Sequence, residues 1–367
     1  NIFWSIPEPF AGADAPAFFF LPHNSFPDHI GIEGTDQWGN PMNEKGLVVL
    51  EQYELDVRNA RRGRGSFLVD TDRGLKLLTE YSGTEGRLEF QAEVMGELRE
   101  KGLKRLDFPV RNKEGGFLVK DREEITYLLR EWHEGRECEV RNLSEVEEAV
   151  RTLAYLHRNF RTAPKEGREN FREESLEEEL TRKNAELKRV RKFMRSRRRK
   201  TEFEQEFLNH FEGFYGEAEA ALEAARSRGL RVLYEKSLAE GWLCHGDYNQ
   251  HHVLLSREGT AITDFGRCHF GVQTGDLAHF FRKILEKQNW DKVYGNAMLR
   301  EYGRVRPLSG EEQEDLRVRL SYPEKFWKLA DHYYGSRKSW IPEKNVEKLR
   351  SLIRQREQRS SFLKILE

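Results

Sequence analysis

Residues 244–271 read CHGDYNQHHVLLSREGTAITDFGRCHFG, a stretch with two acidic residues that each lie on an abrupt turn beside a short apolar strand. Asp247 ends the turn HGD, which precedes the apolar run VLL. Asp264 begins the turn DFG, which follows the apolar run AIT. Glycine and aspartate both favour tight turns. The pattern therefore predicts a short hairpin that brings the two carboxylates to one cleft.

Two carboxylates in one cleft are what phosphoryl transfer requires. One carboxylate orients an attacking hydroxyl group and accepts its proton, and another holds the magnesium ion that bridges the nucleotide phosphates. We therefore interpret Asp247 as the catalytic base and Asp264 as a ligand of Mg²⁺, with ATP as the phosphoryl donor. Each turn alone is also compatible with a purely structural role, and it is their combination that favours the catalytic interpretation.

His252 lies shortly after Asp247, where a further ligand of the metal ion is expected, and we keep it as a candidate metal ligand. Mg²⁺ prefers hard oxygen ligands, so a neutral imidazole binds it poorly. His252 therefore either selects a different metal ion or hydrogen-bonds within its loop without ligating, and we prefer the second alternative. Asn249 is nearby, but its position does not make it a substitute.

A glycine-rich turn precedes this region in the chain and includes Gly63, Gly65 and Ser66. Its backbone N–H groups are candidates for binding phosphates, although a hairpin turn explains the same residues. Lys76, on the strand after the turn, is the candidate phosphate-binding lysine. Side chains alternate along a strand, so Lys76 and Thr79 lie on opposite faces. If the nucleotide faces Thr79, no lysine occupies that position.

Around these motifs the chain divides into a region of short strands and a region of helices. Before residue 131, apolar runs predict strands at 47–55, 67–69, 75–81, 117–119 and 125–129, with one helix over 87–103. Helices follow at 144–156, at 165–214 as one long helix or a helical hairpin, and at 276–285, 291–302, 311–320, 322–334 and 342–356. Glu147 lies where a capping box from Ser144 would place it, and Asp276 is expected to cap its helix or to brace the loop of Asp247.

The charge balance excludes two classes of partner. The chain has 367 residues, with 62 basic and 63 acidic side chains and a net charge of −1, so no global field attracts nucleic acid or an anionic membrane. The basic run 195–200 is offset by acidic residues at 174–179, which favours a solvated helix face. No apolar run approaches the roughly 20 residues that span a bilayer. The unpaired spacing of the three cysteines fits a reducing, cytoplasmic compartment.

These motifs resemble those of aminoglycoside phosphotransferase-like and choline-kinase-like enzymes. The chain is similar in more detail to the CotS family of spore-coat proteins, which share that kinase-like fold and occur in endospore-forming bacteria. The similarity extends from Met42 to Glu367 and leaves residues 1–41 as an unmatched N-terminal extension, expected to be disordered or not native. The segments that carry it are 62–65, 88–91, 131–132, 135–138, 184–191, 245–254, 276–277, 282–284 and 322–327.

The resemblance implies an α+β fold of the bilobal protein-kinase-like class. A small β-rich N-lobe with one main helix would cover residues 42–130, and a larger, mostly helical C-lobe would cover residues 131–367 and contain the HGD and DFG turns. Glu131 would then lie at the hinge between the lobes, near the base of a bound nucleotide.

The resemblance also implies a function. Phosphotransferases of this pattern have Asn at the position of His252 and Lys near Thr79, whereas this chain lacks that Asn and offers only Lys76, on the other face of the strand from Thr79. We therefore expect a CotS-like spore-coat protein that has a structural or assembly role beside other coat proteins, with impaired or absent phosphotransferase activity, as in a pseudokinase. The protein would assemble on the coat from the cytoplasm. The alternative is an active kinase that uses ATP and Mg²⁺ to phosphorylate a hydroxyl group of a small molecule.

Overall fold

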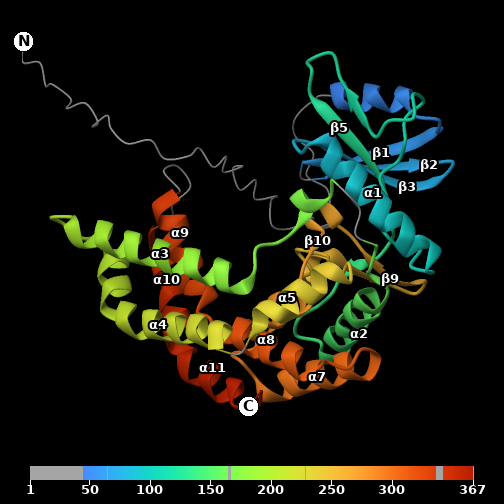
Figure 1. Cartoon of the computed structure of the whole chain (residues 1–367). Coiled ribbons are helices and arrows are strands. Elements are labelled where there is room, and N and C mark those ends of the chain that lie inside the picture. Colours follow the sequence, from blue (N-terminus) through green and yellow to red (C-terminus); the bar gives the residue numbers. More distant parts are fainter. Residues whose placement is uncertain (1–43, 64, 164–166, 228, 336–341, 367) are drawn as a thin grey trace, which may run out of the picture.

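The computed structural model describes residues 44–63, 65–163, 167–227, 229–335 and 342–366. An antiparallel sheet with one long helix forms the N-terminal part, and a larger, mostly helical part follows it (Figure 1). The extension 1–41 and Arg64 of the glycine-rich turn lie outside the described residues. The predicted bilobal arrangement of a small β-rich part and a larger helical part is confirmed.

The N-terminal sheet has five antiparallel strands in the order β1-β2-β3-β5-β4. The strands are β1 (Val57–Gly63), β2 (Ser66–Thr71), β3 (Gly74–Glu80), β4 (Leu118–Lys120) and β5 (Thr126–Glu131), and helix α1 (Glu85–Glu100) connects β3 to β4. The four strands predicted between residues 67 and 129 and the helix predicted over 87–103 are therefore present, with shifted ends.

The stretch 47–55, predicted as a strand, is instead the 3₁₀ helix η1 (Glu44–Gln52). Its buried side chains Val49 and Leu50, together with Tyr53, pack on one face of the sheet against Leu78. The first strand of the sheet is β1, whose residues are almost all exposed. Because β1 lacks apolar alternation, the usual strand signal is missing there.

The two faces of the sheet have different partners. Leu78 of β3 faces η1, and strand alternation puts Lys76 on that same face. Leu77 and Thr79 lie on the opposite face, together with Leu128 of β5, which is paired with Thr79 and packs on α1.

This second face looks toward the helical part. Arg130, paired with Leu77, is on this face. Its partner Asp107 accepts the backbone N–H of Asp264, which joins this side of the sheet to the helical part. The space on this side is called the cleft below.

The helical part is built around two apolar clusters, and all predicted helices are present. Its helices are α2 (Leu143–Asn159), α3 (Leu176–Ser196), α4 (Glu202–Ser227), α5 (Leu230–Ala239), α6 (Thr274–Leu285), α7 (Lys292–Val305), α8 (Gly310–Ser321), α9 (Glu324–Gly335), α10 (Pro342–Arg354) and α11 (Arg356–Leu363). The region 165–214 is a hairpin of α3 and α4, not one long helix. The ring of Phe326, from α9, stacks on Phe207 and Phe214 of α4, with ring centroids 4.2 and 4.6 Å apart.

Some local features differ from the sequence prediction. Helix α2 is capped by Asn142, whose side chain accepts a hydrogen bond from the Ser144 backbone N–H, and not by a capping box from Ser144. Helix α11 was not expected. The three cysteines, Cys138, Cys244 and Cys268, are buried free thiols. Among the described residues, no helix combines the length and the apolar character needed to cross a bilayer.

Candidate active site

Short strands and turns carry the two predicted acidic residues to one end of a small sheet. This sheet has the order β6-β8-β9, with β6 (Arg136–Glu137), β8 (Val253–Ser256) and β9 (Gly259–Ile262). Strands β8 and β9 form the predicted hairpin, in which Val253 pairs with Ile262. Asp247 lies before this hairpin and Asp264 lies after it, so both reach the same end of the hairpin, as the sequence predicts.

Asp276 braces the turn that carries Asp247. Its carboxylate accepts hydrogen bonds from the backbone N–H groups of His245 at 2.5 Å and Gly246 at 2.8 Å. His157 lies 3.2 Å away on the other side. Burial raises the pKa of Asp276, but the hydrogen bond and charge of His157 lower it by more, so that this pKa is about 2. Asp276 lies within the first turn of α6 and does not cap it, so the bracing alternative is the one that holds.

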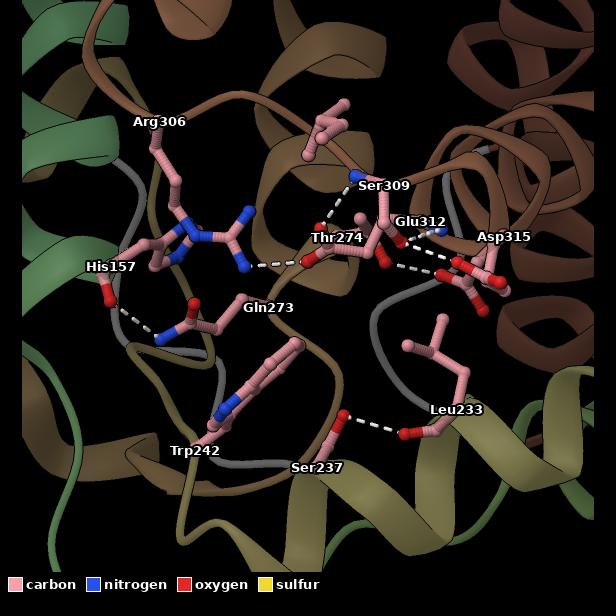
Figure 2. Close-up of polar contacts among 12 residues, drawn as sticks. His157, Leu233, Ser237, Trp242, Gln273, Thr274, Arg306, Ser309, Glu312 and Asp315 are labelled. Carbon is pink, nitrogen blue, oxygen red and sulfur yellow. Dashed lines mark hydrogen bonds and ion pairs between the residues drawn. The ribbon is translucent and has the colours of Figure 1, made fainter.

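The beginning of α6 is itself fixed by buried polar contacts, which Figure 2 shows. The Gln273 amide donates to the backbone carbonyl oxygens of His157, Phe160 and Leu243 at 3.0, 3.2 and 3.1 Å. Leu243 belongs to β7 (Leu243–Cys244), the strand that leads into the HGD turn. Gln273 therefore holds helix α2, strand β7 and the beginning of α6 together beneath the site.

The two acidic turns pack against each other and have unusual backbone angles. Gly246 has a φ of +85°, and a Cβ atom there would lie 2.1 Å from the Arg267 carbonyl oxygen. Asp264 has a φ of +64°, a left-handed conformation that is uncommon outside glycine. Its backbone N–H donates to the carboxylate of Asp107 at 2.9 Å. Contacts outside the turn therefore stabilise both conformations.

Asp247, His252 and Asp264 converge. One ligand atom from each residue lies within 4.8 Å of those of the other two, an arrangement suited to a metal ion. His252 Nδ1 lies 2.8 Å from the Asp247 carbonyl oxygen and 3.1 Å from the Asn249 amide nitrogen, so the ring is held within its loop. Its Nε2 lies 3.5 Å from the Asp264 carboxylate. A cation bound between Nε2 and this carboxylate would stabilise the arrangement.

His279 of α6 positions Asp247, and the sequence analysis did not identify it. His279 Nε2 lies 3.4 Å from Asp247 Oδ1. Arg282, which can only donate, lies 3.3 Å from His279 Nδ1, so the imidazole proton is on Nε2 and faces Asp247. Burial lowers the pKa of His279 to about 4, which leaves the ring neutral at neutral pH. One signal was available, because His279 lies one helical turn after Asp276.

The pKa of Asp247 itself lies below its usual range. Burial raises this pKa, but the contact with His279 and the charges of His252 and Arg267 lower it by more. Asp247 is therefore a carboxylate at neutral pH, the state in which it can accept a hydrogen bond from a hydroxyl group.

A buried ion pair between Arg130 and Asp107 lies on the other wall of the cleft, and the sequence motifs did not indicate it. Arg130, at the end of β5, points to the cleft face of the sheet, and its guanidinium lies 3.6 Å from the carboxylate of Asp107. Both side chains are buried, and burial raises the pKa of Asp107 to about 6 although Arg130 opposes the shift. One guanidinium nitrogen of Arg130 has no hydrogen-bond partner in the described structure. In the sequence, the position of Arg130 directly after the apolar run 125–129 could have indicated a functional cation at the end of this strand.

The structure does not bring Lys76 to this cluster. The Lys76 ammonium group donates to the backbone carbonyl oxygens of Arg73 at 2.5 Å and Leu75 at 3.3 Å, on the η1 side of the sheet. Thr79 lies on the cleft side instead. This is the second of the two alternatives that strand alternation left open, in which no lysine of β3 faces the cleft. The carboxylate of Glu131 pairs with Arg99 at 2.5 Å, at the junction of the sheet and the helical part.

The glycine-rich turn connects β1 to β2. Gly63 pairs with Ser66 across the hairpin, and Ser66 pairs in turn with Thr79 of β3. Gly65 has a φ of +71°, which favours glycine at this position. The turn therefore lies beside the end of β3 that carries Thr79. A role of Gly63, Gly65 and Ser66 in binding phosphates stays a prediction.

An antiparallel sheet with one helix, joined to a helical part that carries the HGD and DFG turns, defines the kinase-like phosphotransferase fold. The structure is similar to the crystal structure of an aminoglycoside phosphotransferase from Alicyclobacillus acidocaldarius, with a TM-score of 0.76, 19% identity and coverage of 92% of this chain and 98% of that one. It also resembles a spectinomycin phosphotransferase solved with ADP and spectinomycin, with a TM-score of 0.62, 11% identity and coverage of 89% and 99%.

The chain belongs to the family described as spore coat putative kinase YutH, whose sequence profile matches residues 47–366. It is also 23% identical to spore coat protein S of Bacillus subtilis over 324 residues, which cover 86% of this chain and 92% of that protein. The resemblance to kinase-like spore-coat proteins that the motifs indicated is confirmed.

Proposed function

We propose that this protein is a spore-coat kinase that transfers a phosphoryl group from ATP to a hydroxyl group of a small molecule, with the help of a divalent cation. The observation that carries the proposal is the convergence of Asp247, His252 and Asp264 within 4.8 Å. Structural neighbours support it, because one was solved with ADP and spectinomycin, and another, an amicoumacin kinase, with AMP-PNP and Ca²⁺. The second has a TM-score of 0.55, 11% identity and coverage of 87% of this chain and 94% of that one.

In this proposal Asp247 is the catalytic base. Its carboxylate orients the acceptor hydroxyl group and takes its proton as the new oxygen–phosphorus bond forms. His279, fixed by Arg282, holds the carboxylate in place through its Nε2 side. Asp276 keeps the backbone of the turn in the conformation that presents Asp247. None of these contacts depends on a bound ligand.

Asp264 and His252 would hold the divalent cation. Carboxylate oxygen suits Mg²⁺, and imidazole nitrogen suits transition metals such as Mn²⁺ better. When bound, the cation would neutralise charge on the β- and γ-phosphates of ATP. The contacts of His252 Nδ1 with Asp247 and Asn249 fix the orientation of the ring, so that Nε2 faces that position, as partners of the second nitrogen often do for metal-binding histidines.

We assign the phosphate-binding charge on the sheet side to Arg130. It lies on the face of the sheet from which Lys76 is absent, and its partner Asp107 also accepts the backbone N–H of Asp264, so its charge lies close to the DFG turn. The turn with Gly63, Gly65 and Ser66 would cover the phosphates, and the segment after Glu131 would lie near the nucleotide base. The division into an N-lobe of residues 42–130 and a C-lobe of residues 131–367 is part of the same proposal.

A second candidate function is a structural or assembly role in the coat, with impaired or absent catalysis and other coat proteins as partners. The orientation of Lys76 favours it, because a phosphate-binding lysine on β3 is missing. Gln91 of α1 favours it too. A kinase pairs its phosphate-binding lysine with a glutamate of this helix, but Gln91 is a buried amide that contacts the sulfur of Met95 at 3.7 Å. In this case the protein would assemble on the coat from the cytoplasm without turnover.

The test is a thermal unfolding measurement on the full chain with ATP and either Mg²⁺ or Mn²⁺. A ligand at about 100 times its dissociation constant adds about 2.7 kcal/mol to the free energy of unfolding. The parent is expected to be stabilised by ATP with cation, and Asp264→Asn is expected to lose that effect. Asp56→Asn, a substitution at an exposed position just before β1, serves as the control. His252→Asn is expected to shift the preference toward Mg²⁺.

ADP formation in the presence of hydroxyl compounds then separates the two candidates. Asp247→Asn is expected to keep the stabilisation by ATP and to lose transfer. Absence of stabilisation with either cation at millimolar ATP would rule out the kinase and leave the assembly role. Binding of ATP without any transfer would favour the pseudokinase.

A further inference from the structure

A hollow in the helical part opens beside Asp247. Its enclosed volume is about 130 Å³, and it is bounded by Gly246 of the HGD turn and by side chains of α3, α6 and α9. This space takes one small polar group of a ligand, and the rest of the ligand would extend from the mouth of the hollow. His279, which contacts Asp247, is one of the lining residues. A hydroxyl group placed at Asp247 would therefore belong to a molecule that also places a polar group in this hollow.

The carboxylates that line the hollow are already engaged. Glu173 lies 3.4 Å from His269, and Lys183 lies 2.5 and 2.6 Å from Glu179 and Glu324. Asp276 accepts the backbone N–H groups of the HGD turn, and Arg319 pairs with Asp315 at 2.7 Å. Acidic groups are thus present, but each one already has a hydrogen-bond or ion-pair partner within the protein.

The cations on the α6 and α9 walls are less completely paired. Among the described residues, no carboxylate lies within ion-pair distance of Arg282, whose guanidinium contacts His279. The nearest carboxylate to Lys328 is that of Glu324 at 3.7 Å, which is already bonded to Lys183. The Lys328 side chain is 50% exposed, so its ammonium group is accessible to a ligand at the mouth of the hollow. Arg282 and Lys328 are therefore the cations of the hollow that are least completely paired with the protein's own carboxylates.

We infer that the acceptor of the proposed kinase is a small hydroxyl compound that also carries an anionic group, a phosphate or a carboxylate, bound by Arg282 and Lys328. This inference rests on the proposed function. The acceptor hydroxyl passes its proton to Asp247, its oxygen bonds to the γ-phosphorus of ATP, and the bond from that phosphorus to ADP breaks. Guanidinium and ammonium groups match either anion through charge-assisted hydrogen bonds.

The same wall disfavours a cationic acceptor. An amino alcohol with its ammonium group in the hollow would meet Arg282 and Lys328 at close range, and like charges in a partly buried site repel strongly. The engaged carboxylates do not offset this, because releasing Glu324 would leave Lys183 without one of its two partners. Charge therefore discriminates between acceptor classes in this hollow.

Calorimetric titration of the full chain without nucleotide tests the inference. The probes are glycerol 3-phosphate, glycerate, glycerol and ethanolamine, which separate a phosphate, a carboxylate, a neutral and a cationic acceptor. One or both anionic probes are expected to bind, and the neutral and cationic probes are not. Lys328→Gln is expected to weaken anion binding about tenfold, the effect of losing one charge-assisted hydrogen bond. Arg282→Gln should weaken it at least as much.

The matched control is Lys344→Gln, which removes an exposed cation on α10, away from the hollow. Its anion affinity should equal that of the parent, and cooperative melting of every variant establishes that it is folded. Tighter binding of ethanolamine, no effect of Lys328→Gln, or no binding of either anionic probe at millimolar concentration would overturn the inference. Anion binding in a protein that ATP does not stabilise would support the anion site and reject the kinase.

Discussion

At the scale of single residues, Asp107 sets the electrostatic state of the cleft. It is buried, it accepts the backbone N–H of Asp264, and Arg130 is its charged partner. Its pKa of about 6 exceeds the ordinary value of 3.8 because burial disfavours the charged form more than Arg130 favours it. The proton on this carboxylate therefore couples the wall of the sheet to the DFG turn.

This raised pKa predicts a pH-dependent contribution to stability. The folded protein binds the Asp107 proton more tightly than the unfolded chain does. The stabilisation is thus complete below pH 3.8 and is lost as the pH rises through about 6, and it amounts to roughly 3 kcal/mol. Between these pH values the parent should lose stability relative to Asp107→Asn in urea unfolding. Asp70→Asn should follow the parent, and parallel curves for parent and Asp107→Asn would contradict the raised pKa.

The sequence was informative about residues that sit in motifs. The convergence of Asp247, His252 and Asp264 could be predicted because each lies within a short segment whose spacing has a chemical meaning. Arg130, Asp107 and His279 could not, since their roles arise from contacts between segments that are far apart in the chain. The choice between Lys76 and Thr79 needed the sheet, because alternation leaves open which face meets the cleft.

At the scale of elements, the HGD and DFG turns form one unit. Gly246 approaches the backbone at Arg267 so closely that a Cβ atom would overlap the carbonyl oxygen. The glycine is therefore required by contact as well as by its positive φ. This close approach holds Asp247 and Asp264 at a fixed separation even before any ligand binds.

Comparing two glycines separates the effect of contact from that of backbone conformation. Gly74 has a φ of +81° and nothing within 4 Å of the place that a Cβ atom would take, whereas Gly246 has a φ of +85° and a clash at 2.1 Å. Gly74→Ala should cost about 1–2 kcal/mol of stability from the left-handed backbone alone. Gly246→Ala should cost about 1–3 kcal/mol more because the turns must separate. Urea unfolding measures both, and equal losses would show that the turns yield without strain.

The type and the ends of some elements could not be predicted from the sequence patterns. The run 47–55 contains enough apolar residues for a strand, but its side chains pack as the 3₁₀ helix η1 on top of the sheet. A short apolar run does not distinguish these states by periodicity. The sequence left open whether 165–214 is one long helix or a hairpin of two helices. The turn between α3 and α4 contains no glycine or proline, so the sequence does not indicate where the first helix ends.

At the scale of the whole molecule, the helical part contains a second core that is separate from the one beneath the site. It gathers α3, α4, α9 and α10 around stacked phenylalanine rings, with Phe326 fully buried at the centre. In Figure 1 these helices lie at the far side of the helical part from the sheet. Local stability can therefore differ between this core and the sheet.

Phe326→Ala tests that separation. Removing a buried ring of this kind costs about 3–5 kcal/mol, and the loss should fall on the helices that share this core. Hydrogen exchange is expected to accelerate in α3, α4, α9 and α10, while β2, β3 and β5 keep their protection. Val232→Ala, at a side chain that is 70% exposed, should change neither region. Uniform acceleration across the sheet would mean that the molecule opens as one unit.

The three buried cysteines have a practical consequence for chemical labelling. Burial raises the pKa of Cys138 and Cys268 to about 12 and moves that of Cys244 well above its ordinary value, so the native chain presents no reactive thiolate. Cysteines introduced on the exposed strand β1 and on the surface of α7 would then be the preferred targets of maleimide dyes. A fluorophore pair at those positions would report whether the distance between the sheet and the helices changes when ATP and a cation are added, without removal of any native cysteine.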